Sequence, residues 1–310
     1  MHECIYRQGK ASGWMLGFLA GYLLAAAAGS ARAEAGNLGA ALKQLGYAQI
    51  ELRRTDENHL FLFGQVNGRR RSCLVDTGWS FTTLSTNAAQ GLATRGLVDE
   101  LKLGRVRLTN ETVLVQDLRV NGQPTSFDLV LGCDFLIRHH AVIDYAHRRL
   151  YLRREPLTGK PVNQLTAALQ QCGLVAVKLS RHDPLALTCT VQINGRAVEF
   201  LVDSGAMWSC LTTETAHALA LPIFPSANRI TGAAVAGKRG FGVTTVRDFE
   251  LGGRQEARVT LAVLELGDWG LGPNGRTLRA VGGILGGDQL SARAAVIDCG
   301  QLKLWQRDRH

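Results

Sequence analysis

The chain has 310 residues and a mass of 33.6 kDa; 46% of its residues are hydrophobic and 20% are charged. These proportions describe a globular chain long enough for two domains of ordinary size, and they exclude a disordered, collagen-like or coiled-coil protein. The 35 Lys and Arg residues outnumber the 26 Asp and Glu residues, which gives a net charge of +9. Because the basic residues are scattered and only 6% of residues are aromatic, we expect no nucleic-acid partner.

The first 33 residues have the three-part layout of a secretory signal peptide. Arg7 and Lys10 precede an uncharged run over residues 11–31, and small residues at 31 and 33 favour cleavage after Ala33. Retention as a membrane anchor is the alternative, because about twenty uncharged residues can span a bilayer. The run is rich in weakly hydrophobic Ala and Gly, which favours cleavage. We therefore expect a periplasmic or secreted protein with no stable membrane partner unless this segment is retained.

Cleavage removes Cys4 and leaves six cysteines in a compartment that permits disulfides. The even count is compatible with bridges, although their pairing cannot be read from the sequence. No C-x-x-C spacing or partnering histidine cluster is present, so we expect no zinc, no other metal and no cofactor. The pair His139-His140 is better explained as the solvated or capped end of a helix. The six cysteines are Cys73, Cys133, Cys172, Cys189, Cys210 and Cys299.

An internal duplication organises the chain. Residues 38–47 align with residues 165–174 at an offset of 127, and the same offset relates the segments Gln65–Arg69 and Gln192–Arg196. The alignment runs without a gap to residue 84 of the first copy, which chance does not produce. The chain is therefore predicted to contain two copies of one structural unit.

The second copy is longer, because the offset grows along the chain. Asp117–Gly122 aligns with Asp248–Gly253 at an offset of 131, and the motifs Leu131–Leu136 and Leu285–Leu290 are 154 residues apart. On this alignment most of the extra length lies in residues 265–281, which are rich in glycine and predict a surface loop.

The boundary between the copies is predicted near residues 153–163, where Pro156, Gly159 and Pro161 interrupt regular structure. We therefore expect a first domain over residues 34–155, a linker over 156–163 and a second domain over 164–310.

Each copy is predicted to be mainly β, with few short helices. A helix over residues 38–45 leads to strands over 48–53 and 60–66, and the chain then turns at Asn67-Gly68 into a strand over 72–75. Asn-Gly between apolar strands is a strong hairpin signal, because both central residues of a type I′ turn need a positive φ. Further hairpin turns are predicted at Asn194-Gly195, Asn121-Gly122 and Gly252-Gly253, and helices are predicted to begin at Cys133 or Asp134 and at Gly287 or Asp288.

Two similar triplets, Asp76-Thr77-Gly78 and Asp203-Ser204-Gly205, follow an apolar strand at equivalent points of the copies. Gly allows a sharp turn, the hydroxyl can bond to the partner loop, and Asp points at whatever faces it. If the copies pack about a pseudo-twofold axis, the carboxylates meet and share a proton. One Asp then serves as general base toward a water while the other polarises and protonates the substrate. A single triplet is more often a plain turn, but two at a repeat offset are far more specific.

With the downstream segments Val130–Leu136, Val142–Tyr145 and Leu150–Leu152, these triplets make the chain resemble the retropepsin-like aspartic proteases, especially their secreted bacterial branch. The resemblance covers nearly all of residues 38–310. It implies two homologous β-barrel lobes related by a pseudo-twofold axis, an active site between them, and one or two hairpin flaps over an extended polypeptide substrate. The chain looks like a monomer that carries both lobes, as pepsins do.

The resemblance also implies roles for individual residues. Asp76 and Asp203 correspond to the catalytic dyad, Thr77 and Ser204 to the interlocking hydroxyls at its base, and Gly78 and Gly205 to the backbone that approaches substrate. The flap of the second lobe is expected in residues 230–242, where Gly232 and Gly237 would contact substrate. The flap of the first lobe is expected in residues 103–113, with a turn near Asn110.

One position departs from the family. After the triplet a small residue is usual, and Ala206 fits this pattern, but Trp79 stands there in the first copy. We favour an indole that lines a substrate subsite, because both triplets and both downstream motifs are present; the alternative is that it crowds a site that has lost activity. Neither residue has a hydroxyl for the outer carboxylate oxygens, so we expect an optimum at about pH 4 to 6, less acid than that of pepsin.

Other matched pairs have structural interpretations. We expect Phe81 and Trp208 in the lobe cores, Asp144 and Asp298 in structural hydrogen bonds, and Asp134 and Asp288 as helix caps.

The sequence therefore predicts an exported single-chain aspartic endopeptidase. The first alternative is a non-catalytic peptide-binding protein with a degenerate protease site, because binding of an extended strand at a sheet edge survives loss of turnover. The second is a glycoside hydrolase, since paired carboxylates also cleave sugars, but few aromatic residues are available for a sugar site.

Overall fold

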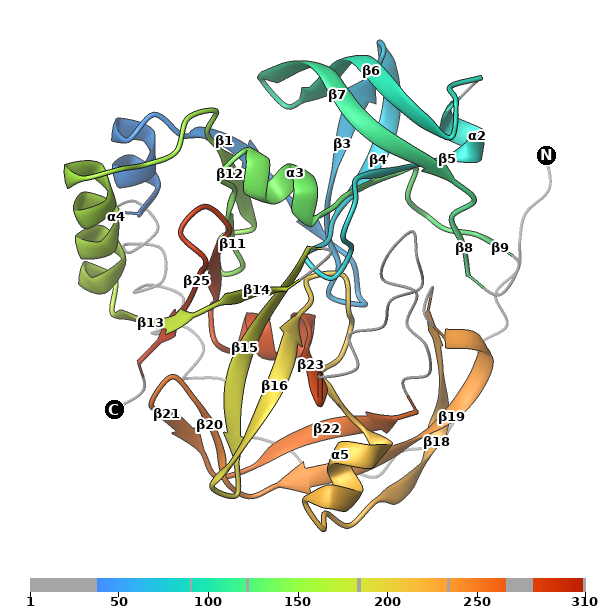
Figure 1. The fold of residues 1–310 in the computed structure, drawn as a ribbon, viewed down its shortest axis with the longest axis vertical. Helices are drawn as coiled ribbons and strands as arrows, with labels where there is room; N and C mark the ends of the chain where they lie inside the picture. The colour runs from blue at the N-terminus through green and yellow to red at the C-terminus, as the bar shows by residue number, and fades with distance from the viewer. Residues whose placement is uncertain are drawn as a thin grey trace, which may run out of the picture.

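The computed structural model describes residues 38–89, 91–120, 123–182, 185–232, 235–265 and 281–308. Within these residues the chain is mainly β with a few short helices, as predicted (Figure 1). Its strands form sheets of seven, ten and six members and one two-stranded ribbon. The predicted signal peptide, the Asn121-Gly122 turn and most of the predicted 265–281 loop lie outside the described residues. No helix in these ranges is both long enough and apolar enough to cross a membrane.

The seven-stranded sheet of the first repeat closes into a barrel. Its strand β3 (Leu60–Val66) pairs with β4 (Arg69–Val75) on one side and with β6 (Arg95–Leu103) on the other. Buried leucines such as Leu60 and Leu84 fill the interior. The order is β2-β3-β4-β10-β5-β7-β6, where β2 is Arg53–Arg54, β10 Leu129–Leu131, β5 Thr83–Ser85 and β7 Val106–Gln116.

The ten-stranded sheet of the second repeat has the same core order. The strands β15, β16, β23, β17 and β22 follow one another as β3, β4, β10, β5 and β7 do in the first repeat, and β20 pairs with β15 as β6 pairs with β3. The members are β14 (Ser180–His182), β15 (Ala186–Ile193), β16 (Arg196–Val202), β17 (Cys210–Thr212), β18 (Phe224–Gly232), β19 (Val235–Val246), β20 (Phe249–Leu251), β21 (Arg254–Glu256), β22 (Val259–Leu264) and β23 (Gly283–Leu285).

A six-stranded sheet at one side of the barrels joins the repeats (Figure 1). Its order is β1-β12-β11 from the first repeat and then β24-β25-β13 from the second, so that equivalent strands are related by a pseudo-twofold axis. At the centre Ile143 of β11 pairs with Ile297 of β24. The strands are β1 (Ala48–Glu51), β11 (Val142–Asp144), β12 (Arg149–Leu152), β13 (Leu174–Lys178), β24 (Val296–Asp298) and β25 (Lys303–Arg307).

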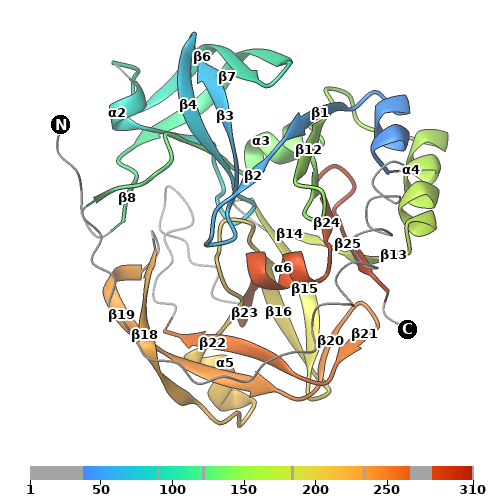
Figure 2. The same ribbon diagram turned by 180° about the vertical axis from the view of Figure 1, so that it is seen from behind.

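Two helices cover one face of this sheet. They are residues 38–44 and α4 (Lys160–Gln171), and they lie side by side in both ribbon views (Figures 1 and 2). Leu42 and Leu169 pack in one apolar cluster with Trp305 of β25. Because a proline near a helix N-terminus loses no hydrogen bond, Pro161 starts α4 instead of interrupting structure.

The predicted type I′ turns are present. Asn67 and Gly68 have φ of 48° and 77°, and Asn194 and Gly195 have φ of 50° and 73°. The Gly252-Gly253 turn, with φ of 57° and 83°, joins β20 to β21. Two helices begin where the sequence predicts, α3 (Cys133–Arg138) and α6 (Gly287–Ala292).

The hydrogen bonds of equivalent turns correct part of the sequence alignment. Asn67 donates its backbone N–H to the Glu100 carbonyl (2.8 Å), and its counterpart Asn194 donates to the Asp248 carbonyl (2.9 Å). Glu100 is therefore equivalent to Asp248 at an offset of 148, and the predicted match of Asp117–Gly122 to that segment is wrong. The same offset separates Leu114 from Ala262, which pair in parallel with the equivalent residues Thr83 and Cys210.

Most of the extra length of the second repeat forms a β-hairpin, not the predicted 265–281 loop. The offset is 127 at β5 and β17 and has risen to 148 at Asp248, a difference of 21 residues. Between these points lie α5 (Thr213–Ala218) and the paired strands β18 and β19. Only six further residues are added before β10 and β23, where the offset is 154.

The first repeat has a different hairpin at the position where we expect its flap. The strands β6 and β7 pair directly, and the chain turns at Gly104, whose φ is 59°. Asn110 lies inside β7, so the predicted turn there is wrong; its positive φ of 59° is a local irregularity of the strand. The short ribbon β8 (Arg119–Val120) and β9 (Gln123–Pro124) follows β7.

The six cysteines from Cys73 to Cys299 are all buried as free thiols, and no disulfide joins any two of them.

Candidate active site

Each triplet begins directly after a central strand of its barrel. The backbone N–H of Asp76 donates to the Leu131 carbonyl (3.1 Å), and that of Asp203 donates to the Leu285 carbonyl (3.0 Å). These bonds continue the parallel pairings β4–β10 and β16–β23 to the first residue of each triplet. Both aspartates are therefore fixed by the most regular part of their barrels.

The two triplets interlock through Thr77 and Ser204. The backbone N–H of Thr77 donates to Ser204 Oγ (2.9 Å), and the backbone N–H of Ser204 donates to Thr77 Oγ1 (3.0 Å). Each hydroxyl then donates to a carbonyl of the opposite strand, Val202 at 2.7 Å and Val75 at 2.8 Å. All four bonds are buried, so the two repeats are held in one fixed register at this point.

The interlock brings Asp76 and Asp203 together. Their carboxyl groups hydrogen bond to each other, and both residues are buried. Each lies against the glycine of the opposite triplet, since a Cβ at Gly78 would overlap the Asp203 carboxyl and one at Gly205 would overlap that of Asp76. Only glycine allows this approach of the two loops.

Backbone N–H groups donate to one oxygen of each carboxylate. Asp76 Oδ1 accepts from Gly78 (2.8 Å), and Asp203 Oδ1 accepts from Gly205 (2.8 Å) and Ala206 (3.0 Å). Burial raises the pKa of Asp76 well above its usual value, and the nearby charge of Asp203 raises it further. Burial also raises the pKa of Asp203, while its backbone donors oppose this effect. The pair therefore favours one shared proton.

A second pair of acids supports the loops that follow the triplets. Asp134 Oδ1 accepts from the backbone N–H and the hydroxyl of Thr82, both at 2.7 Å. In the second repeat Asp288 Oδ1 accepts from the N–H (2.8 Å) and hydroxyl (2.7 Å) of Ser209. Both acids also receive the next N–H of their helix, but the N-cap residues are glycines without a capping side chain. The predicted helix-cap role is thus incomplete, because each acid also anchors the loop that follows the triplet of its repeat.

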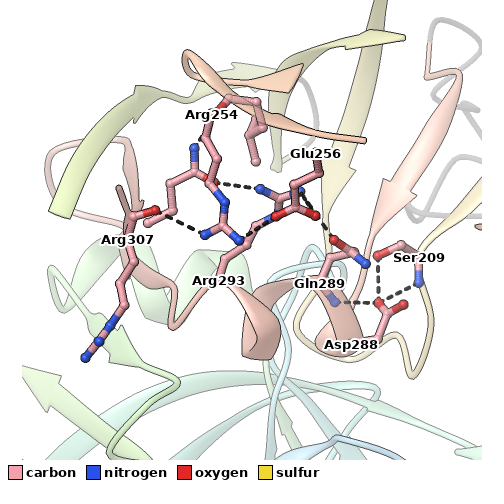
Figure 3. Close-up of polar contacts among 9 residues, drawn as sticks. Ser209, Arg254, Glu256, Asp288, Gln289, Arg293 and Arg307 are labelled. Atoms are coloured by element: carbon pink, nitrogen blue, oxygen red, sulfur yellow. Dashed lines mark hydrogen bonds and ion pairs between the residues drawn. The ribbon is translucent and has the colours of Figure 1, made fainter. Parts of the chain in front are cut away.

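The far end of α6 is held by buried charge. Figure 3 shows Arg293 directed at Glu256 of β21, with Nη2 to Oε2 at 3.3 Å, and Arg254 bonded to the same glutamate. Arg293 Nη1 also donates to Gln306 Oε1 (3.0 Å), which links the helix to β25. Since both arginines are buried and paired, α6 is fixed at its end as well as at Asp288.

The equivalent end of α3 uses a histidine. His139 Nε2 lies 3.0 Å from Glu111 Oε1, and Arg138 donates to Glu111 Oε2 at 2.6 Å. His139 and Glu111 are buried. His139 does end the helix as predicted, but the expected solvated role is wrong, because it forms a buried bridge to β7.

Trp79 and Ala206 differ in side chain but share a backbone role. The carbonyl of Trp79 accepts from the N–H of Cys133, and that of Ala206 accepts from Gly287, both at 2.7 Å. The indole donates from Nε1 to Thr83 Oγ1 (2.9 Å) and packs against an apolar cluster of its own repeat. The indole is thus anchored on the first barrel.

The remaining predicted pairs have mixed outcomes. Trp208 is not a core residue: it is 36% exposed, and its ring lies 5.6 Å from that of Phe241 in β19. Phe81 is half-buried. The structural hydrogen bonds predicted for Asp144 and Asp298 are confirmed. Asp144 accepts from the backbone N–H of His147 (3.1 Å), and Asp298 accepts from that of Gln301 (2.9 Å).

Two residues near the dyad are not among the predicted site residues. The imidazole of His59 hydrogen bonds to the Gly205 backbone and lies near Asp203, while burial lowers its pKa. Cys133 Sγ donates to the Thr77 carbonyl at 2.9 Å. Neither has a counterpart in the other repeat, where the equivalent residues are Ala186 and Gly287, so the duplication could not reveal them.

Residues 189–290 match the family model of the gag-polyprotein putative aspartyl protease. The matched segment lies within the second repeat and contains the triplet Asp203-Ser204-Gly205, and over this segment the chain is similar to the retropepsin-like aspartic proteases. This family is one of aspartic-type hydrolases.

Among solved structures, the aspartic proteinase from Irpex lacteus is similar with a TM-score of 0.46 and 12% identity, over 84% of this chain and 97% of that chain. A retropepsin-like aspartic protease from Rickettsia conorii has a TM-score of 0.31 and 18% identity, over 43% of this chain and 91% of that chain. No curated protein matches the chain.

Proposed function

We propose that this protein is an exported aspartic endopeptidase in which Asp76 and Asp203 act together on one water molecule. The observation that carries the proposal is the contact of two buried carboxyl groups, one from each repeat, with raised pKa values. The match of the second repeat to an aspartyl protease family supports a polypeptide substrate.

The chemistry needs one ionised and one protonated acid. We assign the ionised form to Asp203, which accepts from the backbone N–H groups of Gly205 and Ala206. As general base it takes a proton from the water while the water oxygen attacks the scissile carbonyl carbon. Asp76 gives its proton to the carbonyl oxygen, which yields a neutral tetrahedral diol. When the C–N bond breaks, the leaving nitrogen takes the proton held by Asp203, and a diol hydroxyl returns a proton to Asp76. No covalent intermediate forms, and both acids end as they began.

The hairpin β18–β19 is the proposed flap. This hairpin is the main insertion of the second repeat. Gly232 ends its first strand, and Gly237 lies in its second strand. The contact between Trp208 and Phe241 links this hairpin to the loop that follows Asp203. We infer that closure of the hairpin excludes water and holds an extended substrate over the dyad.

Catalysis is favoured over the non-catalytic alternative by the position of Trp79. Its indole is held against the first barrel through Thr83, so it can form a subsite wall beside the dyad together with Ala206 on the other side. We further propose a periplasmic or secreted monomer, supported by the N-terminal signal pattern and by the presence of both triplets in one chain.

The test is to express residues 34–310, incubate them with a diverse peptide mixture across the acid to neutral range, and map the new termini by mass spectrometry. We expect internal cleavages that are blocked by a peptide whose scissile amide is replaced by a secondary alcohol, because that group mimics the tetrahedral intermediate. Binding of peptides without any new termini would favour the non-catalytic alternative.

A further inference from the structure

A row of aromatic rings on the first barrel leads away from the dyad. We call His59, Phe127, Phe61 and Phe63 the aromatic row. Successive ring centroids are 6.0, 5.7 and 5.7 Å apart. Its first member, His59, contacts the Gly205 backbone, so the row is continuous with the proposed active site.

The outer end of the aromatic row is exposed. Residues of β3 alternate between the two faces of the sheet, so Phe61 and Phe63 point away from the barrel core, and Phe63 is 41% exposed. The three phenylalanines of the row line a pocket of about 500 Å³, together with residues of β4 and of the segment before β10. Contiguous exposed apolar surface of this kind marks binding sites.

Two arginines stand over the last ring. The guanidinium of Arg70 lies 4.1 Å from the Phe63 ring centroid, and that of Arg53 lies 5.3 Å from it. Within the described part of the chain neither arginine has a carboxylate partner. A guanidinium stacked on a ring keeps the N–H groups of its edge for a planar acceptor such as a carboxylate.

The charge of the pocket favours an anion. Arg70 and Arg71 both line it, and Arg71 donates to the Ala88 carbonyl at 3.1 Å. The one acid in its lining, Asp128, accepts from the backbone N–H (2.9 Å) and the hydroxyl (3.1 Å) of Ser72 with Oδ2. Two arginines and one acid leave the pocket with net positive charge.

We propose that this pocket binds an apolar side chain and an adjacent carboxylate of the polypeptide substrate, at a distance from the scissile bond. The inference rests on the proposed protease function. Arg70 precedes Asp76 by six residues of a strand that rises ~3.3 Å per residue, so the two lie roughly 20 Å apart along the barrel. An extended substrate covers this length with about six residues.

The test uses paired peptides with one cleavable core and either Glu or Gln at each of the fourth to eighth positions from the scissile bond. The purified protein is compared with Arg70→Gln and Phe63→Ser. The matched control is Arg181→Gln on β14, which removes the same charge from an exposed site on the other repeat. KM is measured for turnover, and Kd is measured by fluorescence anisotropy on the Asp76→Asn background.

Wild type is expected to prefer a Glu peptide over its Gln partner by about tenfold in KM and Kd at one or two adjacent positions. Arg70→Gln should remove this preference, and Phe63→Ser should weaken the binding of both peptides of that pair. Arg181→Gln should leave both the preference and the affinity unchanged. Equal binding of Glu and Gln peptides at all positions, or an equal loss of preference in the control, overturns the inference.

The two proposals fail in different ways. Charge-dependent binding without cleavage would contradict the protease function and keep the pocket. Cleavage of Glu and Gln peptides with equal KM would keep the protease function and reject the pocket. Sedimentation of the wild-type protein and of the Phe63→Ser variant tests for self-association. If the wild type is a dimer and the variant is a monomer, the aromatic row is a contact between two copies of the chain, and the inference is overturned.

Discussion

Thr77 and Ser204 exchange backbone hydrogen bonds across the junction of the repeats, at 2.9 and 3.0 Å, and each hydroxyl donates onward to the opposite strand. The two residues are 127 positions apart in the chain, at equivalent points of the duplication. Their four bonds fix the distance between Asp76 and Asp203, because each aspartate directly precedes one of them. The geometry of the dyad therefore depends on this buried exchange.

We predict that Thr77→Val and Ser204→Ala each lower the free energy of unfolding by about 1 to 3 kcal/mol, since each leaves buried partners without a hydrogen bond. The double variant should lose less than the sum of the single losses, because the first substitution already loosens the junction that holds the other hydroxyl in place. Urea unfolding of all four proteins measures this coupling. Ser204→Thr keeps the hydroxyl and serves as the control that should retain most of the stability. Additive losses would show that the two residues do not act as one unit.

Peptide cleavage should be fastest in mildly acid solution, with kcat/KM highest at about pH 4 to 6. The reaction needs the singly protonated pair, which exists between the two apparent pKa values of the dyad. Burial raises the pKa values of both Asp76 and Asp203, and this moves the active range toward neutral pH. A profile of kcat/KM against pH measures this optimum, and a maximum at about pH 2 would contradict the expected effect of burial.

A buried acid away from the dyad should make the protein less stable at neutral pH. Burial raises the pKa of Asp298 to about 6, whereas an unfolded Asp has a pKa of about 3.9. The folded state therefore holds this proton more tightly, and the resulting stability is present below about pH 4 and is lost as the pH rises through about 6. Asp298→Asn should raise the free energy of unfolding by ~2 kcal/mol at neutral pH and give no gain in acid.

The control for this prediction is Asp144→Asn at the equivalent position of the first repeat. Asp144 Oδ2 lies 2.7 Å from His147 Nδ1, so its substitution removes the carboxylate partner of this ring and should not stabilise the protein. Thermal unfolding at several pH values distinguishes the two variants. A neutral-pH gain of the same size for both would point to a general charge effect instead of the burial of Asp298.

Shortening the β18–β19 hairpin should reduce turnover without unfolding the second barrel. Pro225 pairs with Gly242, so Ser226 and Phe241 can be joined by a two-residue Asn-Gly turn in place of residues 227–240. If the hairpin closes over substrate, kcat/KM should fall by about 10²-fold or more. The circular dichroism spectrum should remain mainly β. Unchanged kcat/KM in a folded variant would reject the role of the hairpin as a flap.

Local signals predicted a large part of this fold. The Asn-Gly turns are readable because they need positive φ, and the triplets are readable because they recur at one offset with the same neighbours. The long insertion was misplaced because residues 117–122 and Asp248–Gly253 both begin with Asp and end with Gly, whereas Glu100 is the structural equivalent of Asp248. Strand pairing, which identifies the correct match, depends on distant residues.

Non-local pairs near the site were also missed. His139 finds its partner Glu111 on a strand that only the fold brings near, so a local pattern suggested a solvated helix end. Thr82 and Ser209 could have been found, because both carry a hydroxyl at the same offset as the triplets. His59 could not, since the second repeat has Ala186 at the equivalent position.

The most direct test of a single dyad shared by two repeats is to assay Asp76→Asn and Asp203→Asn separately and as a mixture, under conditions in which the wild-type protein cleaves peptides. Each variant removes one carboxyl group while it keeps the size of the side chain. We predict that both lose peptide cleavage to below detection and that mixing them restores none, because each chain needs both of its own aspartates. Retained cleavage by either single variant, or recovery on mixing, would contradict this account.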